Sequence, residues 1–440
     1  MKIAKITAAT VTTAALALGL AACSTSETPK AAEPKPEASA SGPAYAGKTL
    51  TVWRLGDSNP AAAKYMEALN AEFTKVTGAA VKLEWIPWPT VNDKFTAAAA
   101  GNGGPDVTEI GNDQVPLWQS QDALSPITAL AGAGEQAQIP KNLLGLETID
   151  GEVYALPWGA GSRAVLYRTD WFKELKIEVP KTWDELVAAA KKIKAEKGSD
   201  VDGFAFNGGS DANHLLGALA WSEGAEYALK EGDKWVGKTT DPKFAAGFKT
   251  YTSLVTDGLS GKSRLTQNTV DIRKRFANNK VGMYLTAGWD LPGIEQDSKG
   301  KLKGDKLAFF PLPAKSGGEA PSFFGGNDIA VWGSTQQKEL GAEYVKLATS
   351  KTWADRYAME GGLLPIYPDT LAGLASDPAQ APFAAAFAKA KAFPADPNWT
   401  EANETKAVFQ NAARAVIEGK KDEATALADA NKELEEILNQ

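Results

Sequence analysis

The hydrophobic residues after position 48 follow first a strand period and then a helix period. Residues 49–53 read Thr-Leu-Thr-Val-Trp, an alternation that predicts a strand. Asn59-Pro60 then predicts a helix N-cap followed by proline in the first turn. Apolar side chains recur at helical spacing until Gly78, and residues 81–86 predict a second strand. Because the order is strand, helix, strand, we expect a βαβ unit with parallel strands.

The same alternation continues to the C-terminus and predicts an α/β fold. Thr182 and Glu185 have the spacing of a capping box, and so have Ser334 and Gln337. No second linker-like stretch interrupts residues 47–440, so we expect two domains with interleaved segments. Further strands are expected over residues 105–110, 151–156, 164–167, 203–206, 281–286, 307–310 and 329–332. Further helices are expected over residues 182–197, 215–220, 244–254, 270–278, 334–350, 352–359, 382–392 and 405–438.

The first 23 residues have the pattern of an export signal. Lys2 and Lys5 precede an apolar stretch over residues 6–20, which is short for a membrane span. The stretch ends in Leu20-Ala21-Ala22-Cys23, which resembles the bacterial lipobox, whose cysteine becomes the lipid-modified first residue of the mature protein. An ordinary secretory signal is disfavoured, because the single cysteine of the chain falls at this position. We therefore expect removal of residues 1–22 and acylation of Cys23, palmitate included.

A flexible tether is predicted over residues 23–47. Ser, Thr, Pro, Glu, Ala and Lys dominate it, and such a composition cannot bury a core. Treated as a random coil, it spans roughly 25 Å. The tether would hold the body of the protein on the extracytoplasmic face of the cell membrane.

Composition narrows the chemistry of the body. Lys and Arg number 47 against 54 Asp and Glu, a net charge of −7 with no basic block, which argues against a nucleic-acid partner. One cysteine excludes an intrachain disulfide and a thiolate metal cluster, and one histidine excludes a multi-histidine metal site. We expect no cofactor and no metal.

Six polar loops follow predicted strands, where open α/β sheets bind ligands. Each mixes glycine with hydrogen-bonding side chains, and Trp158 and Trp289 lie in two of them; Trp399 lies in another polar stretch. Sugars have apolar faces that stack on aromatic rings and hydroxyl rims that need polar partners, and these loops supply both. The six loops are residues 54–57, 111–114, 158–163, 208–214, 288–290 and 325–328.

Structural roles compete with ligand contact at several of these positions. Asp57 and Asp113 have the setting of turn or capping residues, and Asp290 could cap a helix that starts at Pro292. Arg163 could form a structural ion pair, and His214 has the position of a helix-start residue. Simple packing is expected for Trp171, Trp183, Trp235, Trp332 and Trp353.

An ordered set of short motifs over residues 48–440 resembles a known family. Together with the lipobox and the tether, it is similar to the family 1 extracellular solute-binding proteins of ABC importers, the maltodextrin-binding-protein-like sugar receptors. The motifs are Leu50-Thr51-Val52-Trp53, residues 73–78, Pro105-Asp106-Val107, residues 151–158, residues 166–170, Lys181-Thr182-Trp183-Asp184-Glu185-Leu186 and Gly361-Gly362-Leu363-Leu364-Pro365.

The resemblance implies a periplasmic-binding-protein-like type II fold, with two α/β lobes around a central cleft. Residues 48–158 plus 328–368 would form the first lobe and residues 159–327 plus 369–440 the second. The protein would be a monomer that binds a di- or oligosaccharide and delivers it to the transmembrane subunits of an ABC permease. Taken together, the loops and the resemblance give these candidate ligand-binding residues: Asp57, Asn112, Asp113, Trp158, Arg163, Asp211, Asn213, Trp289, Asp290, Asn327 and Trp399.

One departure from the family bears on the ligand. Many relatives carry an acid in the loop after the Pro-Trp pair, where this chain has Gly161, so that contact is lost or replaced by Arg163. Residues 109–112, Glu-Ile-Gly-Asn, look similar to members that bind chito- or cello-type disaccharides.

Two other functions compete with a sugar receptor. A lipid-anchored glycosidase would need two carboxylates across a cleft, and Asp57, Asp113, Asp211 and Asp290 offer them, although no Gly-x-Ser-x-Gly nucleophile motif occurs. A metal or peptide receptor of the same shape is the other alternative. The single histidine disfavours metal capture, and tryptophan beside Asp and Asn is more typical of sugar binding than of peptide binding.

Overall fold

The computed structural model describes residues 44–440 except 102, 375 and 378–379. The predicted signal and Cys23 therefore lie outside the described residues, and so does the tether up to residue 43. Pro43–Gln440 form one compact unit. The body begins within the expected tether, because the backbone N–H of Tyr45 donates to the carbonyl of Thr77 at 3.0 Å.

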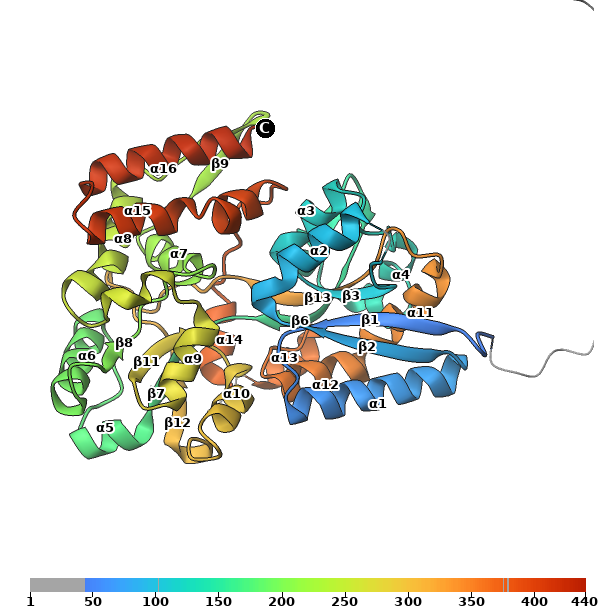
Figure 1. Cartoon of the computed structure of the whole chain (residues 1–440), viewed down its shortest axis with the longest axis horizontal. Helices are drawn as coiled ribbons and strands as arrows, with labels where there is room; N and C mark the ends of the chain where they lie inside the picture. Colours follow the sequence, from blue (N-terminus) through green and yellow to red (C-terminus); the bar gives the residue numbers. More distant parts are fainter. Residues whose placement is uncertain (1–43, 102, 375, 378–379) are drawn as a thin grey trace, which may run out of the picture. The chain divides into compact units, whose positions relative to one another are not determined.

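A mixed sheet forms around the predicted βαβ unit (Figure 1). In spatial order its strands are β2 (Ala80–Ile86), β1 (Thr49–Leu55), β3 (Val107–Gly111), β13 (Gly325–Val331) and β6 (Leu156–Gly161). β1 pairs in parallel with both β2 and β3, which confirms the predicted βαβ unit. β13 runs antiparallel between β3 and β6. We call this sheet and the helices packed on it the first lobe.

A second sheet forms the centre of the second lobe, with its strands in the order β12 (Leu307–Phe310), β7 (Ala164–Arg168), β11 (Val281–Thr286) and β8 (Asp202–Phe204). β7 is antiparallel to both neighbours, and β11 is parallel to β8. The chain passes from the first sheet to the second directly, from β6 into β7. Two small hairpins that the sequence did not predict are β4 (Thr148–Ile149) with β5 (Glu152–Val153), and β9 (Ala228–Glu231) with β10 (Lys234–Gly237).

Helices cover both sheets, and in Figure 1 those of the first lobe lie on either side of its sheet, with α1 and α12 on one side and α2 and α3 on the other. Two hydrophobic clusters fill the first lobe and two others centre on the second. The helices are α1 (Pro60–Thr77), α2 (Val91–Ala100), α3 (Val115–Ser120), α4 (Thr128–Ala131), α5 (Thr169–Leu175), α6 (Trp183–Lys197), α7 (Asn213–Ser222), α8 (Pro242–Thr256), α9 (Thr269–Ala277), α10 (Asp290–Asp297), α11 (Lys338–Ala348), α12 (Lys351–Gly361), α13 (Pro368–Leu374), α14 (Ala381–Phe387), α15 (Val408–Ile417) and α16 (Glu423–Leu438). Shorter turns include η1 (Trp88–Thr90), η2 (Asn112–Gln114), η5 (Lys262–Thr266) and the π-helical η7 (Glu401–Thr405).

Several predicted helix ends are confirmed, whereas one predicted capping box is absent. Asn59 caps α1 through the N–H of Ala62, and Gly78 ends it with φ +79°. The capping box of Thr182 is present. The box predicted at Ser334 is not, because Thr335 accepts from the backbone N–H of Gln337 and α11 starts only at Lys338.

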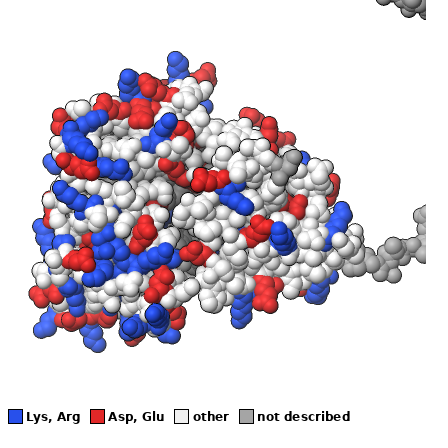
Figure 2. Space-filling model, viewed as in Figure 1, with Lys and Arg blue, Asp and Glu red and all other residues white. Residues whose placement is uncertain are grey.

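The charged surface agrees with the mixed composition. Figure 2 shows acidic and basic side chains intermixed over the viewed face of the protein. No helix in the described part of the chain is long and apolar enough to cross a membrane.

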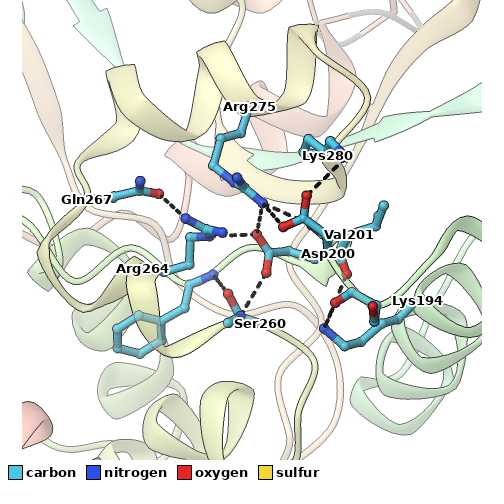
Figure 3. A network of polar contacts seen from close by, with 12 residues as sticks. Lys194, Asp200, Val201, Ser260, Arg264, Gln267, Arg275 and Lys280 are labelled. Atoms are coloured by element: carbon cyan, nitrogen blue, oxygen red, sulfur yellow. Dashed lines mark hydrogen bonds and ion pairs between the residues drawn. The ribbon is translucent and has the colours of Figure 1, made fainter.

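A buried ion-pair network holds the second lobe together beneath β8. The carboxylate of Asp202 is 2 % exposed and accepts from Nε of Arg264 at 2.8 Å and from the backbone N–H of Gly261 at 2.8 Å. Arg275 approaches the same carboxylate at 3.4 Å, and Figure 3 shows Arg264 and Arg275 close together in this network. The network therefore ties β8 to η5 and α9.

Asp202→Ala should destabilise the protein strongly, because it leaves the buried Arg264 without its counter-charge. Loss of one member of a buried pair costs about 3–5 kcal/mol. Asp200→Ala is the matched control, because that carboxylate is exposed and pairs with Lys280 in solvent. Chemical denaturation measures both variants, and equal small losses would contradict a structural role for Asp202.

Candidate functional site

The loops that follow the parallel strands bring the two lobes into contact. Asp57 follows β1, and its carboxylate lies 3.1 Å from Nη2 of Arg273 on α9 of the second lobe. Asn112 follows β3 and donates to the carbonyl of Phe324 at 3.4 Å. The first-lobe side of the candidate site is therefore built at the carboxyl ends of β1 and β3.

A buried ion pair anchors the first-lobe side of the site. Glu109, in the middle of β3, is fully buried and pairs with Arg54 at the end of β1. Its carboxylate also accepts from the N–H of Leu55 at 2.7 Å, the hydroxyl of Tyr357 at 2.7 Å and the amide of Asn327. Burial lowers the pKa of Arg54, but the charge of Glu109, the hydrogen bond to it and the nearby tyrosines together raise this pKa above its usual value. The predicted site residue Asn327 thus faces Glu109.

Asp113 lies in η2, two residues after the end of β3. Burial raises the pKa of its carboxyl to about 6, because removal of water disfavours the charged form. A backbone hydrogen bond and the charge of Arg163 offset this only in part. The negative charge of the Asp113 carboxylate is therefore only partly compensated by Arg163 of the second lobe.

Trp289 and Arg163 form the second-lobe side of the site. The guanidinium of Arg163 lies between two rings, 5.2 Å from the centroid of Trp289 and 5.3 Å from that of Phe323. Trp289 is half-buried, so part of its ring remains exposed. Gly362 of the first lobe lies against this loop, and a Cβ there would come within 2.2 Å of the backbone of Gly288.

A small recess of ≈ 10 Å³, with room for about one water molecule, lies beside Arg163. Nη1 of Arg163 and Nδ1 of His214 are buried in this region, and neither has a hydrogen-bond partner among the described residues. Burial lowers the pKa of Arg163 to about 10, with the carboxylates of Asp211, Asp113 and Asp290 opposing the change. The recess is lined by Arg163, Ala205, Asn207, Asp211, His214, Leu215, Thr269, Ile272, Tyr284 and Leu285.

Asp211 and Asp290 are held in place by neighbouring donors. Asp211 accepts from the backbone N–H of Thr269 at 3.1 Å and from its hydroxyl. Asp290 accepts from the hydroxyls of Tyr284 at 2.8 Å and Thr286 at 2.7 Å. Burial raises the pKa of Asp290, although the hydrogen bond from Thr286 opposes it. Helix α10 begins at Asp290 itself, so the helix start expected at Pro292 is wrong by two residues.

Three predicted site residues are buried in the cores. Trp158 is 1 % exposed and stacks on Tyr357 with centroids 4.1 Å apart. Trp399 is also 1 % exposed and stacks on Phe393 at 4.9 Å. Asn213 is fully buried and donates to the side chain of Asn403. In this structure packing covers both indole rings, so Trp289 is the ring of the predicted set that a ligand can reach.

The structure adds site residues that the sequence analysis missed. Glu404 of η7 accepts from the side-chain amides of Asn92 and Gln114 in the first lobe. Burial raises the pKa of Glu404 to about 7, and the charges of Asp113 and Asp211 add to it. Trp88 is 40 % exposed and lies beside Gly56, whose φ of +98° and close approach to the indole both favour glycine.

Within residues 44–440 as described, no group of three or more His, Cys, Asp or Glu is placed to hold a metal ion. The polar groups of the site are instead carboxylates, amides and guanidinium groups, arranged around an indole. Such groups can bind a polar ligand through hydrogen bonds and stacking.

The family of bacterial extracellular solute-binding proteins matches residues 56–355 of the chain. The chain belongs to this family. The solute-binding protein is 30% identical over 404 residues to the diacetylchitobiose binding protein DasA of Streptomyces coelicolor, a match that covers 90% of each chain. The family consists of binding proteins, which agrees with the expectation of a receptor.

Solved structures agree with the fold. A solute-binding protein of Thermotoga lettingae bound to alpha-D-tagatose has a TM-score of 0.79 and 24% identity, covering 89% of this chain and 100% of its own. The GacH receptor of Streptomyces glaucescens has a TM-score of 0.76 and 21% identity, with 89% and 99% coverage. The type II periplasmic-binding-protein fold expected from the sequence is therefore confirmed.

A pair of buried carboxyl groups lies behind the site, next to β13. Glu147 is 1 % exposed and Asp328 is 2 % exposed, and neither forms an ion pair with a Lys or Arg of the described chain. Burial raises the pKa of Glu147 to about 7, although a hydrogen bond with Asp328 opposes it. Burial, and then the charge of Glu147, raises the pKa of Asp328 well above its usual range. The folded protein therefore binds a proton here that the unfolded chain releases near its ordinary pKa.

This pair predicts a loss of stability as the pH rises from about 4.5 to 7, because the folded state holds the proton more tightly across that window. Glu147→Gln should flatten the dependence and raise stability at pH 8 relative to pH 5. Thermal unfolding at both pH values tests this, with the exposed Glu433→Gln as control. A Glu147→Gln profile parallel to that of the wild type would contradict the assignment.

Proposed function

We propose that the protein is the substrate-binding component of an ABC importer and captures a di- or oligosaccharide between its two lobes. The observation that carries the proposal is the half-buried ring of Trp289 beside Arg163, whose guanidinium feels the charges of Asp113 and Asp211, where loops of both lobes meet. An indole face with acidic and amide groups around it matches a sugar ring and its hydroxyls. The similarity to a diacetylchitobiose binding protein supports a β-linked disaccharide of the chito or cello type.

Binding would work by differential affinity. A sugar that touches Trp289 in one lobe and Asp113 in the other makes both sets of contacts only when the lobes are together, so ligand shifts the population toward that state. The contacts of Asp57 with Arg273, and of Glu404 with Asn92 and Gln114, lie between the same lobes. The lobes would consist of residues 48–158 plus 328–368 and 159–327 plus 369–440, with boundaries inside β6 and β13.

The protein would act at the outer face of the cell membrane. The lipobox-like sequence before Cys23 and the tether to about residue 47 support a lipid anchor. The receptor would work as a monomer, hand the sugar to the permease unchanged and need no cofactor. Release of monosaccharides from a bound disaccharide would instead support the glycosidase alternative.

Trp289→Ala should weaken sugar binding at least about tenfold, because an aromatic face buried against a sugar contributes more than about 1.4 kcal/mol. Calorimetry and intrinsic fluorescence measure the affinity after a thermal-shift screen has identified a ligand. Trp235→Ala is the control, because that half-buried ring bonds to Asp396 outside the site. Unchanged affinity in the Trp289 variant would contradict the proposal that the sugar stacks on this ring.

Cys23→Ser should release the protein from membranes, because no acyl chain can then be attached. Fractionation of cells into membrane and soluble parts measures this, and Ser24→Ala is the neighbouring control. A Cys23→Ser protein that stays with the membranes would refute the lipid anchor.

A further inference from the structure

The contact between the lobes contains a group of hydrogen-bond acceptors, which we call the acceptor seam: Asn92, Asp113, Gln114 and Glu404. In Figure 1 the segment before α15 reaches toward α2 and α3. Glu404, from this segment, accepts from Nδ2 of Asn92 and from Nε2 of Gln114, the latter at 3.4 Å. Nε2 of Gln114 also lies 3.2 Å from Oδ1 of Asn92. Hydrogen bonds thus hold the polar ends of Asn92, Gln114 and Glu404 together.

Negative charge at the seam exceeds positive charge. Asp113 and Asp211 both repel the charged form of Glu404, and burial disfavours it further. The positive charge of Arg163 interacts with the carboxylates of Asp113 and Asp211, but its guanidinium lies beside the rings of Trp289 and Phe323. None of Asp113, Asp211 and Glu404 forms an ion pair with a Lys or Arg of the described chain. Carboxylates buried in this way are stabilised by a cation brought to them.

A buried amide at the seam also lacks a donor. Gln114 is 6 % exposed, and its Oε1 is buried without a hydrogen-bond partner among the described residues. Because its Nε2 is bound at Glu404 and Asn92, the free oxygen lies within the seam. A sugar hydroxyl would fill one acceptor but leave the charge uncompensated. An ammonium group supplies three donors and a positive charge together.

We propose that the acceptor seam selects a saccharide that carries a free amino group, such as a glucosamine unit, and places its ammonium at Asp113, Gln114 and Glu404. The inference rests on the proposed sugar-binding function and specifies the ligand of that same site. Binding is an ion pair with hydrogen bonds and forms no covalent bond. If the seam serves only to hold the lobes together, it will favour no class of sugar.

The test compares three β-1,4-linked disaccharides by calorimetry: cellobiose, diacetylchitobiose and the fully deacetylated chitobiose. At pH 7 the deacetylated sugar should bind the wild type at least about tenfold more tightly than cellobiose, since hydrogen bonds to charged groups exceed neutral ones by about that factor. The preference should shrink at pH 5, where Asp113 and Glu404 are protonated. Cellobiose affinity should change less than threefold between the two pH values.

Glu404→Gln should lower the affinity for the deacetylated sugar at least about tenfold more than the affinity for cellobiose, because the neutral amide keeps the shape of the side chain but not its charge. Glu401→Gln, in the same turn but paired with Lys406, should change neither affinity. Thermal unfolding confirms that both variants fold. An equal loss of affinity for all three sugars in Glu404→Gln would overturn the proposal, because it would mean that Glu404 only holds the lobes together.

The failures of the two proposals are distinguishable. Binding of cellobiose and deacetylated chitobiose with equal affinity would overturn the amine preference and leave the sugar receptor intact. Failure of these disaccharides and of a wider saccharide screen to bind at all would overturn both.

Discussion

The buried ion pair of Arg54 and Glu109 is the interaction on which the first-lobe side of the site depends. A charge pair removed from water is costly unless its remaining hydrogen-bonding positions are filled. Here the backbone of Leu55, the hydroxyl of Tyr357 and the amide of Asn327 fill those of Glu109. These partners come from β1, α12 and β13, so satisfying one carboxylate fixes three elements in mutual register. The loops that carry Asp57 and Asp113 extend from the same strands.

The second lobe contains buried charges in two different settings. Beneath β8, Asp202 receives two guanidinium groups and a backbone N–H, and this network is remote from the ligand loops. At the site, Arg163 has one unsatisfied nitrogen, although Asp113, Asp211 and Asp290 act on it from nearby. The carboxylate of Asp202 is thus paired within the framework, whereas Arg163 keeps an unpaired nitrogen where the lobes meet. This distribution is typical of a surface prepared for a polar ligand.

Periodicity and capping patterns were enough to predict most elements, because the strands are buried runs and several caps are unambiguous. The capping box at Ser334 failed because Thr335, one residue on, bonds to Asp106 of a distant strand end and to the N–H of Gln337. Among the candidate residues, the glycine-rich loops predicted ligand contacts for Asp57, Asp113 and Trp289; Asp57 lies at the contact between lobes, and ligand contact by all three stays a prediction. Burial of Trp158 depends on Tyr357, about 200 positions away along the chain, and no local pattern reports such packing. A site role for Glu404 was not predicted for the same reason, because its partners Asn92 and Gln114 are also distant in sequence.

The strands β6 and β13 lead from the first sheet toward the second. Where they do so, both strands consist of small residues. Gly161 pairs with Gly325, and Gly326 pairs with Ala160. A Cβ on Gly326 would lie 2.9 Å from the carbonyl oxygen of Gly159, so the backbones touch with no side chain between them. No side chains of its own therefore restrict the torsion of this ribbon, although Trp289, Phe323 and Arg163 lie beside Gly161 and Gly325. Because its backbone freedom depends on four small residues, larger substitutions there would stiffen the connection and change the equilibrium between lobe arrangements.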